Sequence, residues 1–357
     1  MKDSNDRYDY SIPRKALLWF FYLFAAVTVL IFFLVYPGIN EYEAAKFDEM
    51  VYGDAYRPFV YRTLIPSTIR LISEITPQPV IDWVQGRTQR SFTGMKLVSL
   101  SKVETEYIYE YMVGLVLFLF CFTGFAFTMR ALIRECYKLP DYAADFGGAA
   151  ALFLIPLFFK YCNYIYDPGT LLFFALGLLL IVRRNWLLFL PVFLLAAINK
   201  ETSVFLILLI IIREYKSSGL FRAALKALPF FIIWVAVKSS ITYIFRDNPG
   251  GLAEFHMFGH NLWLLTDIRS IITVGLIIGA FYFLVKHHWS DKPEFLRWSL
   301  LAIAIPYALL GMTFGWFDEL RMYYEVYIIA YLLALPSVLL IFGVEDDLLE
   351  KRSKTFS

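Results

Sequence analysis

The feature that most constrains this chain is a series of apolar stretches without charged residues, the first of which runs from Ala16 to Val35. A helix needs roughly 20 apolar residues to cross the hydrocarbon core of a bilayer. The composition agrees, because 59% of the 357 residues are hydrophobic and only 18% are charged, whereas average soluble domains carry about 25% charged residues. The sequence therefore predicts an all-α polytopic membrane protein that forms a single membrane domain over residues 1–357.

The positions of lysine and arginine predict how this domain crosses the membrane. Ten transmembrane helices are expected, at 16–36, 111–133, 147–165, 170–182, 186–198, 202–212, 225–245, 263–285, 298–316 and 323–343. Basic residues favour the cytoplasmic side, and ten helices with both termini inside place most Lys and Arg residues there. If residues 186–212 formed one helix, every later loop would change sides and Arg213 and Lys216 would lie outside. Ten helices are therefore preferred, with a cavity where the helices flanking Lys200 stop short of the outer surface.

Three non-membrane segments complete the predicted topology. Residues 37–107 form a long first extracytoplasmic loop, whose middle part, 63–85, is expected to contain one or two amphipathic helices at the membrane interface. Residues 247–261 are too polar to span and form a second extracytoplasmic loop that caps another part of the protein. Residues 344–357 form a short cytoplasmic tail.

With this topology, the unusual ionisable residues collect on the outer face. Ionisable side chains at membrane depth are costly and commonly functional. A carboxylate just outside the first helix could act as a general base, and the candidates there are Asp48, Glu41 and Glu49. Candidate phosphate-binding side chains are Lys200, Arg321, Arg62, His256 and His260, and candidate supporting residues are Asp54, Arg57, Asp167, Glu201, Asp247 and Glu319.

Each of these candidates also has a purely structural interpretation. The carboxylates of the first loop can be ordinary solvated residues. Asp167 precedes a proline and fits a helix N-cap. Lys200 can form an interhelical ion pair without any ligand, because charges at membrane depth usually pair. Arg321 can form a salt bridge with the neighbouring Asp318 or Glu319.

His256 and His260 have the four-residue spacing that places two imidazoles on one helix face, as in some metal sites. Gly259 and the lack of a third clear ligand argue against that use, and contact with a phosphate or a sugar is preferred. The sequence thus predicts no resident metal site, although a divalent cation as cofactor is left open.

Three short motifs resemble those of a known superfamily. Pro58-Phe59-Val60-Tyr61-Arg62-Thr63-Leu64-Ile65-Pro66 resembles the PF-x-x-R-x-L-x-P stretch that follows the first acidic loop in many bacterial integral-membrane glycosyltransferases. Asn199-Lys200-Glu201-Thr202 resembles their R-E-T helix junction, with lysine in place of arginine, and Glu319-Leu320-Arg321 resembles their E-x-R turn before a late helix. These motifs are similar to those of the C-type glycosyltransferases (GT-C), both in their order along the chain and in their predicted position on the outer side of the membrane.

The resemblance implies a transferase of the cell (inner or plasma) membrane with its active face outside the cytoplasm. It would take a sugar from a polyprenyl-phosphate donor and pass it to a glycan, lipid or protein acceptor. The implied catalytic carboxylate lies in the first outer loop, with Asp48 preferred over Glu41, and Lys200 and Arg321 would hold the carrier phosphate. Membrane lipid is a further expected partner, whereas the net charge of +2 gives no support for nucleic-acid binding.

Two other classes of function use the same residues differently. A transporter or flippase of a lipid-linked glycan or an anion would use Lys200 and Arg321 as a substrate site, and it should show broken helices and repeat symmetry. A non-catalytic subunit of a cell-envelope assembly would tolerate loss of the outer carboxylates.

Overall fold

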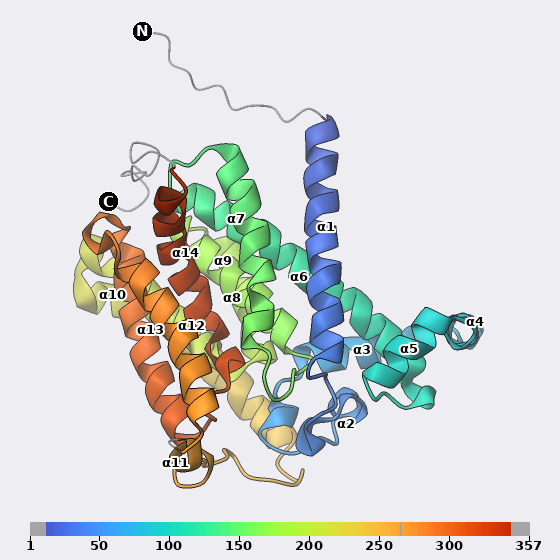
Figure 1. Cartoon of the computed structure of the whole chain (residues 1–357). Coiled ribbons are helices and arrows are strands. Elements are labelled where there is room, and N and C mark those ends of the chain that lie inside the picture. The colour runs from blue at the N-terminus through green and yellow to red at the C-terminus, as the bar shows by residue number, and fades with distance from the viewer. Residues whose placement is uncertain (1–11, 265, 344–357) are drawn as a thin grey trace.

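The computed structural model describes residues 12–264 and 266–343, in which every regular element is a helix (Figure 1). The predicted cytoplasmic tail, 344–357, and the first eleven residues lie outside the described part of the chain. Within that part, seven helical segments are long and apolar enough to cross a membrane. This architecture is consistent with the predicted α-helical polytopic membrane protein.

The long helices follow the predicted apolar segments. They are α1 (Ile12–Val35), α6 (Ile108–Cys136), α7 (Asp141–Phe153), α8 (Asp167–Val182), α9 (Trp186–Asn199), α10 (Val204–Ile244), α12 (Ile268–Lys286), α13 (Glu294–Thr313) and α14 (Tyr324–Ile341). The short α11 (His260–Leu264) precedes α12, and short 3₁₀ turns occupy Glu43–Ala45, Phe59–Tyr61, Thr105–Tyr107, Ile155–Phe158, Glu201–Ser203, Trp289–Asp291 and Leu320–Tyr323.

The element α10 is a hairpin of two helices rather than one rod. Gly219 has φ of 76° and ψ of 165°, which is not helical, and glycine adopts such a conformation without steric cost. Beyond it the chain returns along itself, since Lys226 forms an ion pair with Glu214 and the indole Nε1 of Trp234 donates to the backbone oxygen of Glu201. The predicted segments 202–212 and 225–245 are thus the two antiparallel halves of α10.

The alternative of a single helix over 186–212 is wrong. Lys200 has extended backbone angles, φ −157° and ψ 144°, and separates α9 from the 3₁₀ turn that leads into α10. The Nδ2 of Asn199 stabilises the break by donating to the backbone oxygen of Tyr166 at 3.1 Å and to the Oγ1 of Thr170 at 3.0 Å. This break turns two charged side chains toward partners elsewhere in the protein.

The predicted segment 147–165 is wrong at its C-terminal end. The α7 helix ends at Phe153, the following 3₁₀ turn ends at Phe158, and residues 159–166 form an irregular connection. Asn163 fixes this connection to the end of α1, because its Nδ2 donates to the backbone oxygen of Phe33 at 2.7 Å and its N–H to the backbone oxygen of Gly38 at 2.8 Å. Aromatic residues in a buried irregular segment had the same apolar signature as a membrane helix.

Both ends of the described bundle lie on the same side, at the top of Figure 1, where α1 begins and α14 ends. The same side carries ion pairs that join different helices, among them Arg134–Asp141, Arg183–Glu135 and Lys216–Glu294. The opposite side carries α2, α3 and α11 (Figure 1). This separation agrees with the predicted arrangement of basic loops on one side and functional loops on the other, while the membrane topology itself stays a prediction.

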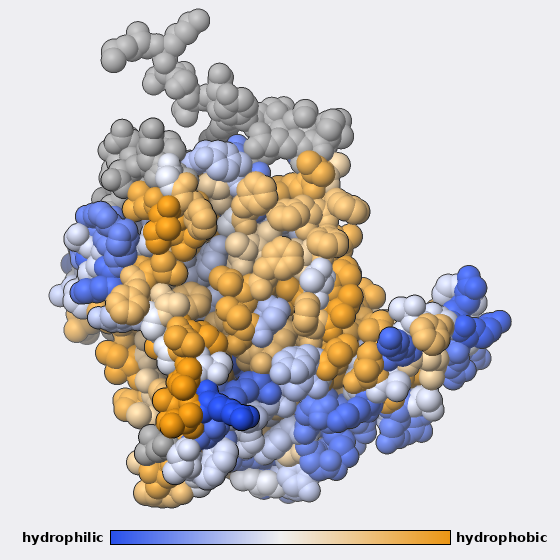
Figure 2. Space-filling view, viewed as in Figure 1, coloured by the Kyte–Doolittle hydropathy of each residue, from blue (hydrophilic) through white to orange (hydrophobic). Residues whose placement is uncertain are grey.

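The first long loop is built from short helices. These are α2 (Phe47–Tyr52), α3 (Leu64–Ile75), α4 (Gln78–Arg90) and α5 (Phe92–Leu100), of which α4 and α5 lie to the side of the bundle (Figure 1). Two of them, α3 and α4, cover the region where interfacial helices were expected. Figure 2 shows a broad hydrophobic surface over the long helices and hydrophilic surface below it and around α4.

Close helix packing in the bundle depends on small residues. A Cβ atom built on Gly148 of α7 would lie 2.5 Å from the Tyr22 hydroxyl of α1 and 2.7 Å from the Ala126 backbone oxygen of α6. Small residues allow helix backbones to approach one another in membrane proteins. Three helices therefore meet at Gly148 with no room for a side chain.

We expect Gly148→Ala to lower the free energy of unfolding of the protein in lipid nanodiscs by about 1–3 kcal/mol, because the added methyl group overpacks the junction. The matched control is Gly279→Ala on α12, where a Cβ would meet no atom within 4 Å and alanine improves helix propensity by about 1 kcal/mol. Thermal unfolding of both variants tests this, and equal midpoints would contradict it.

Candidate functional site

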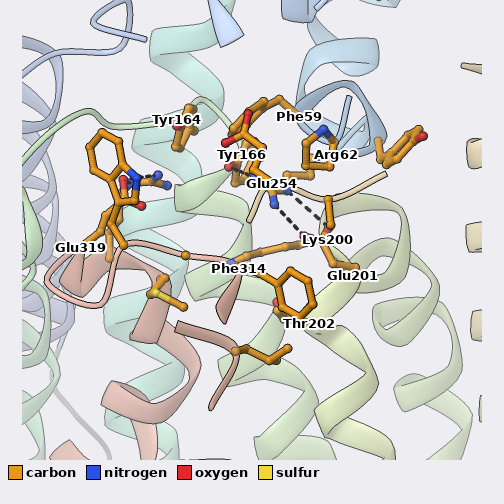
Figure 3. Close-up of a pocket in the computed structure, with 18 of the residues that line it drawn as sticks. Phe59, Arg62, Tyr164, Tyr166, Lys200, Glu201, Thr202, Glu254, Phe314 and Glu319 are labelled. Carbon is orange, nitrogen blue, oxygen red and sulfur yellow. Dashed lines mark hydrogen bonds and ion pairs between the residues drawn. The ribbon is translucent and has the colours of Figure 1, made fainter. Parts of the chain in front are cut away.

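A cavity of about 590 Å³ opens on the side of the first and second loops (Figure 3). Six parts of the chain line it: the first loop, the 159–166 connection, the α9–α10 break, the returning half of α10, the second loop, and the region from the end of α13 to the start of α14. The three motif segments that resemble glycosyltransferase sequences all contribute to this lining, through Arg62, Lys200 with Glu201, and Glu319 with Arg321.

The Arg62 guanidinium is the centre of one group of contacts. Its Nη2 lies 2.6 Å from the Oε1 of Glu201 and its Nη1 donates to the Tyr166 hydroxyl (Figure 3). Burial alone would lower the pKa of Arg62, but the facing carboxylate of Glu201 outweighs it and raises the pKa further above its ordinary value. Arg62 is therefore a permanent cation that joins the first loop to the helix break.

Arg321 is held by two carboxylates and an aromatic ring. Its Nη2 lies 2.6 Å from the Oε1 of Glu319, its Nη1 lies 3.4 Å from the Oδ2 of Asp167, and its guanidinium carbon lies 3.7 Å from the centroid of the Tyr164 ring. Asp167 is the first residue of α8 and accepts from the backbone N–H of Tyr164 at 3.0 Å. The prediction that it caps the helix is wrong, because its oxygens face Arg321 and the preceding turn.

Lys200 pairs with a buried carboxylate of the last helix. Its Nζ lies 3.3 Å from the Oε1 of Glu325, whose side chain is 1% exposed. Thr202 donates to the same oxygen. Lys200 and Glu201 therefore have separate partners, and the interhelical ion pair considered for Lys200 is present.

Lys238 is the cavity cation that sequence analysis missed. It lies on the returning half of α10 and lines the cavity. Its Nζ is buried and, among the described residues, has no hydrogen-bond partner. A buried ammonium group without a partner is energetically costly, so an anion bound beside this nitrogen would stabilise its charged form. The hairpin at Gly219 brings it here, which no local pattern in the sequence indicates.

Glu254 is the second residue that sequence analysis missed. It belongs to the second loop, and the hydroxyl of Tyr42 lies 3.2 Å from its Oε1 and 3.3 Å from its Oε2. The Nε2 of His256 lies 3.1 Å from its Oε2. In the sequence, the only indication of a role for Glu254 was its position between a glycine-containing turn and two histidines.

The two histidines have different partners. The Nε2 of His260 lies 2.7 Å from the Oδ1 of buried Asp318, whereas His256 faces Glu254. His256 precedes α11, so the expected placement of both imidazoles on one helix face is wrong. No group of three or more His, Cys, Asp or Glu side chains suited to a metal ion occurs in the described part of the chain.

Asp318 organises the wall beside the histidines. Lys160, Tyr161 and His260 all make hydrogen bonds to its carboxylate. Burial by itself raises the pKa of Asp318, but the three hydrogen-bond donors outweigh burial and hold the pKa below its ordinary value. The Trp316 ring then stacks on His260 with 4.4 Å between centroids and lines the cavity.

The predicted carboxylates of the first loop lie in different places. Glu41 lines the cavity, and its Oε2 lies 2.8 Å from the Nζ of Lys102. Asp48 and Glu49 are on α2, and neither lines the cavity. Burial is the main cause that raises the pKa of Glu49 above its ordinary value. Asp54 follows α2 and also lies outside the lining.

Arg57 and Asp247 do not line the cavity. The Nη1 and Nη2 of Arg57 donate to the backbone oxygens of Arg246 at 2.8 Å and Gly250 at 2.6 Å. Arg57 thereby fastens the second loop to the first. Asp247 lies 3.4 Å from the Nε of Arg246, and its side chain is 89% exposed.

Comparisons with known proteins identify no relative of this chain: no protein-family model, curated protein or solved structure matches it. The arguments about function therefore depend on the site itself.

We expect Glu325→Ala to cost about 3–5 kcal/mol of stability, because removal of one partner leaves the buried ammonium of Lys200 uncompensated. Glu294→Ala breaks the exposed pair with Lys216, whose side chains are 41% and 62% exposed, and should cost less than about 1 kcal/mol. The double change Lys200→Met with Glu325→Leu should recover most of the loss. Thermal unfolding in nanodiscs measures all three variants, and a double variant no more stable than Glu325→Ala would refute the pairing argument.

Proposed function

We propose that this protein is an integral-membrane glycosyltransferase that moves a sugar from a polyprenyl-phosphate carrier to an acceptor on the extracytoplasmic side. The observation that carries the proposal is the cavity itself, which combines an unpartnered buried ammonium, that of Lys238, with several carboxylates and an apolar wall. The resemblance of the three motifs to GT-C sequences supports the same reaction, because their charged residues meet at this cavity.

The cations divide into two groups by their partners. Arg62, Lys200 and Arg321 each face a carboxylate within 2.6–3.4 Å, so they contribute positive charge to the wall while their closest contacts are already occupied. Within residues 12–264 and 266–343, Lys238 has no such partner. We therefore assign the first contact with the donor phosphate to Lys238, where it would stabilise the negative charge that develops on the departing phosphate.

One side of the cavity suits the apolar part of the donor. It is formed by side chains from α10, the second loop, α13 and the turn before α14: Trp234, Leu252, Leu310, Phe314 and Met322. A polyprenyl chain next to such a wall would remove apolar surface from water, which is favourable by about 25 cal/mol per Å². A phosphate, a sugar and a lipid chain could thus bind in one continuous site.

The proton of the acceptor hydroxyl needs a base within hydrogen-bond reach. The glutamates that line the cavity are Glu41, Glu201, Glu254 and Glu319, whereas Asp48 lies outside its lining. The preference for Asp48 stays a prediction from the sequence, and the transfer assay below tests it through Asp48→Asn.

A transporter of lipid-linked glycans or anions is the second candidate, and one observation favours it. The chain is broken at Lys200 between the short apolar helix α9 and the first half of α10, and discontinuous helices often carry substrate sites in transporters. Such a protein would bind a polyprenyl-phosphate sugar without transferring it.

We expect the purified protein in nanodiscs to transfer radiolabelled sugar from a panel of polyprenyl-phosphate sugars to glycan, lipid or protein acceptors. Lys238→Met should weaken donor binding about 10- to 100-fold, as expected for a lost charge-assisted hydrogen bond. Lys96→Met, which removes an exposed lysine on α5, should change nothing.

Three other results would contradict the proposal. Donor binding without turnover across the panel would favour the transporter. Absence of donor binding would favour a non-catalytic assembly subunit. Equal donor affinity of wild type and Lys238→Met would remove Lys238 from the phosphate site.

A further inference from the structure

We infer that Glu254 is the general base of the proposed transfer, held in place by Tyr42 and His256. The inference depends on the proposed function and names a residue of the second loop, whereas the sequence motifs direct attention to the first. Glu254 lines the cavity and is labelled in Figure 3.

Pairing distinguishes Glu254 from the other cavity carboxylates. Glu41 faces Lys102 at 2.8 Å, Glu201 faces Arg62 at 2.6 Å and Glu319 faces Arg321 at 2.6 Å. In each of these pairs a cationic side chain occupies a lone-pair position of the carboxylate that an acceptor hydroxyl would need. Among the described residues, Glu254 has no lysine or arginine partner, and its contacts are a tyrosine hydroxyl and an imidazole.

Those two contacts fix the position of the carboxylate. The Tyr42 hydroxyl lies within hydrogen-bond distance of both oxygens, and His256 lies next to Oε2. Burial, and then the charge of Glu254, raise the pKa of Tyr42 to about 12, so Tyr42 stays protonated and donates. A carboxylate has about four lone-pair positions, which leaves capacity on Oε1 for an acceptor hydroxyl.

The second loop is held firmly enough to carry such a group. The Nδ2 of Asn248 donates to the backbone oxygens of Gly53 at 2.8 Å and Ala55 at 3.0 Å, and the N–H of Arg57 donates to the backbone oxygen of Pro249 at 2.8 Å. On the other side of Glu254, the N–H of His256 donates to the backbone oxygen of Thr313 at 3.0 Å. The backbone is thus held by hydrogen bonds both before and after Glu254 in the chain.

The step balances without any further reactant. The acceptor hydroxyl gives its proton to Glu254 while its oxygen forms a bond to the anomeric carbon of the sugar. The bond between that carbon and the phosphate oxygen breaks, and its electron pair leaves with the polyprenyl phosphate. Attack from the side opposite the leaving group inverts the anomeric centre.

We expect Glu254→Gln to lower the rate of sugar transfer by about 10²- to 10⁴-fold, the usual contribution of a general base, while donor affinity stays within about threefold. The matched control is Glu74→Gln, which makes the same change at a carboxylate of α3 that is 61% exposed and should leave transfer unaltered. Turnover and binding of the same polyprenyl-phosphate sugar are measured for both.

Tyr42 is a positioning residue and has a separate test. Tyr42→Phe should lower kcat without changing donor affinity, and it should add nothing further in the Glu254→Gln background, because both changes act on one group. Independent, additive effects would show that Tyr42 acts only on stability and would remove it from the inference.

The outcomes separate this inference from the proposed function. If wild type transfers sugar and Glu254→Gln retains its rate, Glu254 is not the base, and the transferase stands with Glu41, Glu319 or Asp48 in that role. If Glu254→Gln loses donor binding together with turnover, its role is in binding and the inference is overturned. If wild type transfers nothing, the proposed function itself fails.

Discussion

The ion pair between Arg62 and Glu201 is the interaction on which the architecture of this site depends. It joins the part of the first loop that precedes α3 to the break between α9 and α10, and both of its members line the cavity. Breaking a helix at membrane depth leaves backbone and side-chain polar groups that need partners. Here Arg62, Glu325 and the side chain of Asn199 supply them, so the cavity and the break stabilise each other.

The helices were predictable because a chain inside a lipid bilayer has few alternatives to helical structure. Hydropathy did not decide between one helix and two over residues 186–212, and the charged residues did. Lys200 and Glu201 at the junction indicated two short helices rather than one, and Lys200 has extended backbone. The failure at 147–165 has the same origin: a buried irregular segment rich in tyrosine and phenylalanine is as apolar as a membrane helix. Hydropathy indicates that a segment is buried, but it does not distinguish a helix from an irregular connection. In the structure, the hydrogen bonds that Asn163 makes to the backbone oxygens of Phe33 and Gly38 hold the irregular connection in place.

The site was predictable where the sequence concentrated charge in an apolar context. Arg62, Lys200, Glu201, Glu319 and Arg321 were selected for that reason, and all of them line one cavity. Lys238 and Glu254 were missed because long-range geometry places them. The reversal at Gly219 delivers the lysine, and backbone contacts between the two loops deliver the glutamate. Neither the chain reversal nor the contacts between the loops can be recognised from the residues around Lys238 or Glu254 in the sequence.

The returning half of α10 forms a wall of the cavity, yet large apolar side chains cover its outer surface, among them Phe231, Ile232 and Val235, which are 46%, 58% and 40% exposed. In the predicted membrane these side chains would face the acyl chains of the lipid. Lipid would then pack against the outer side of the same helix that presents Lys238 to the cavity, so bilayer thickness and acyl-chain order would influence the shape of the cavity.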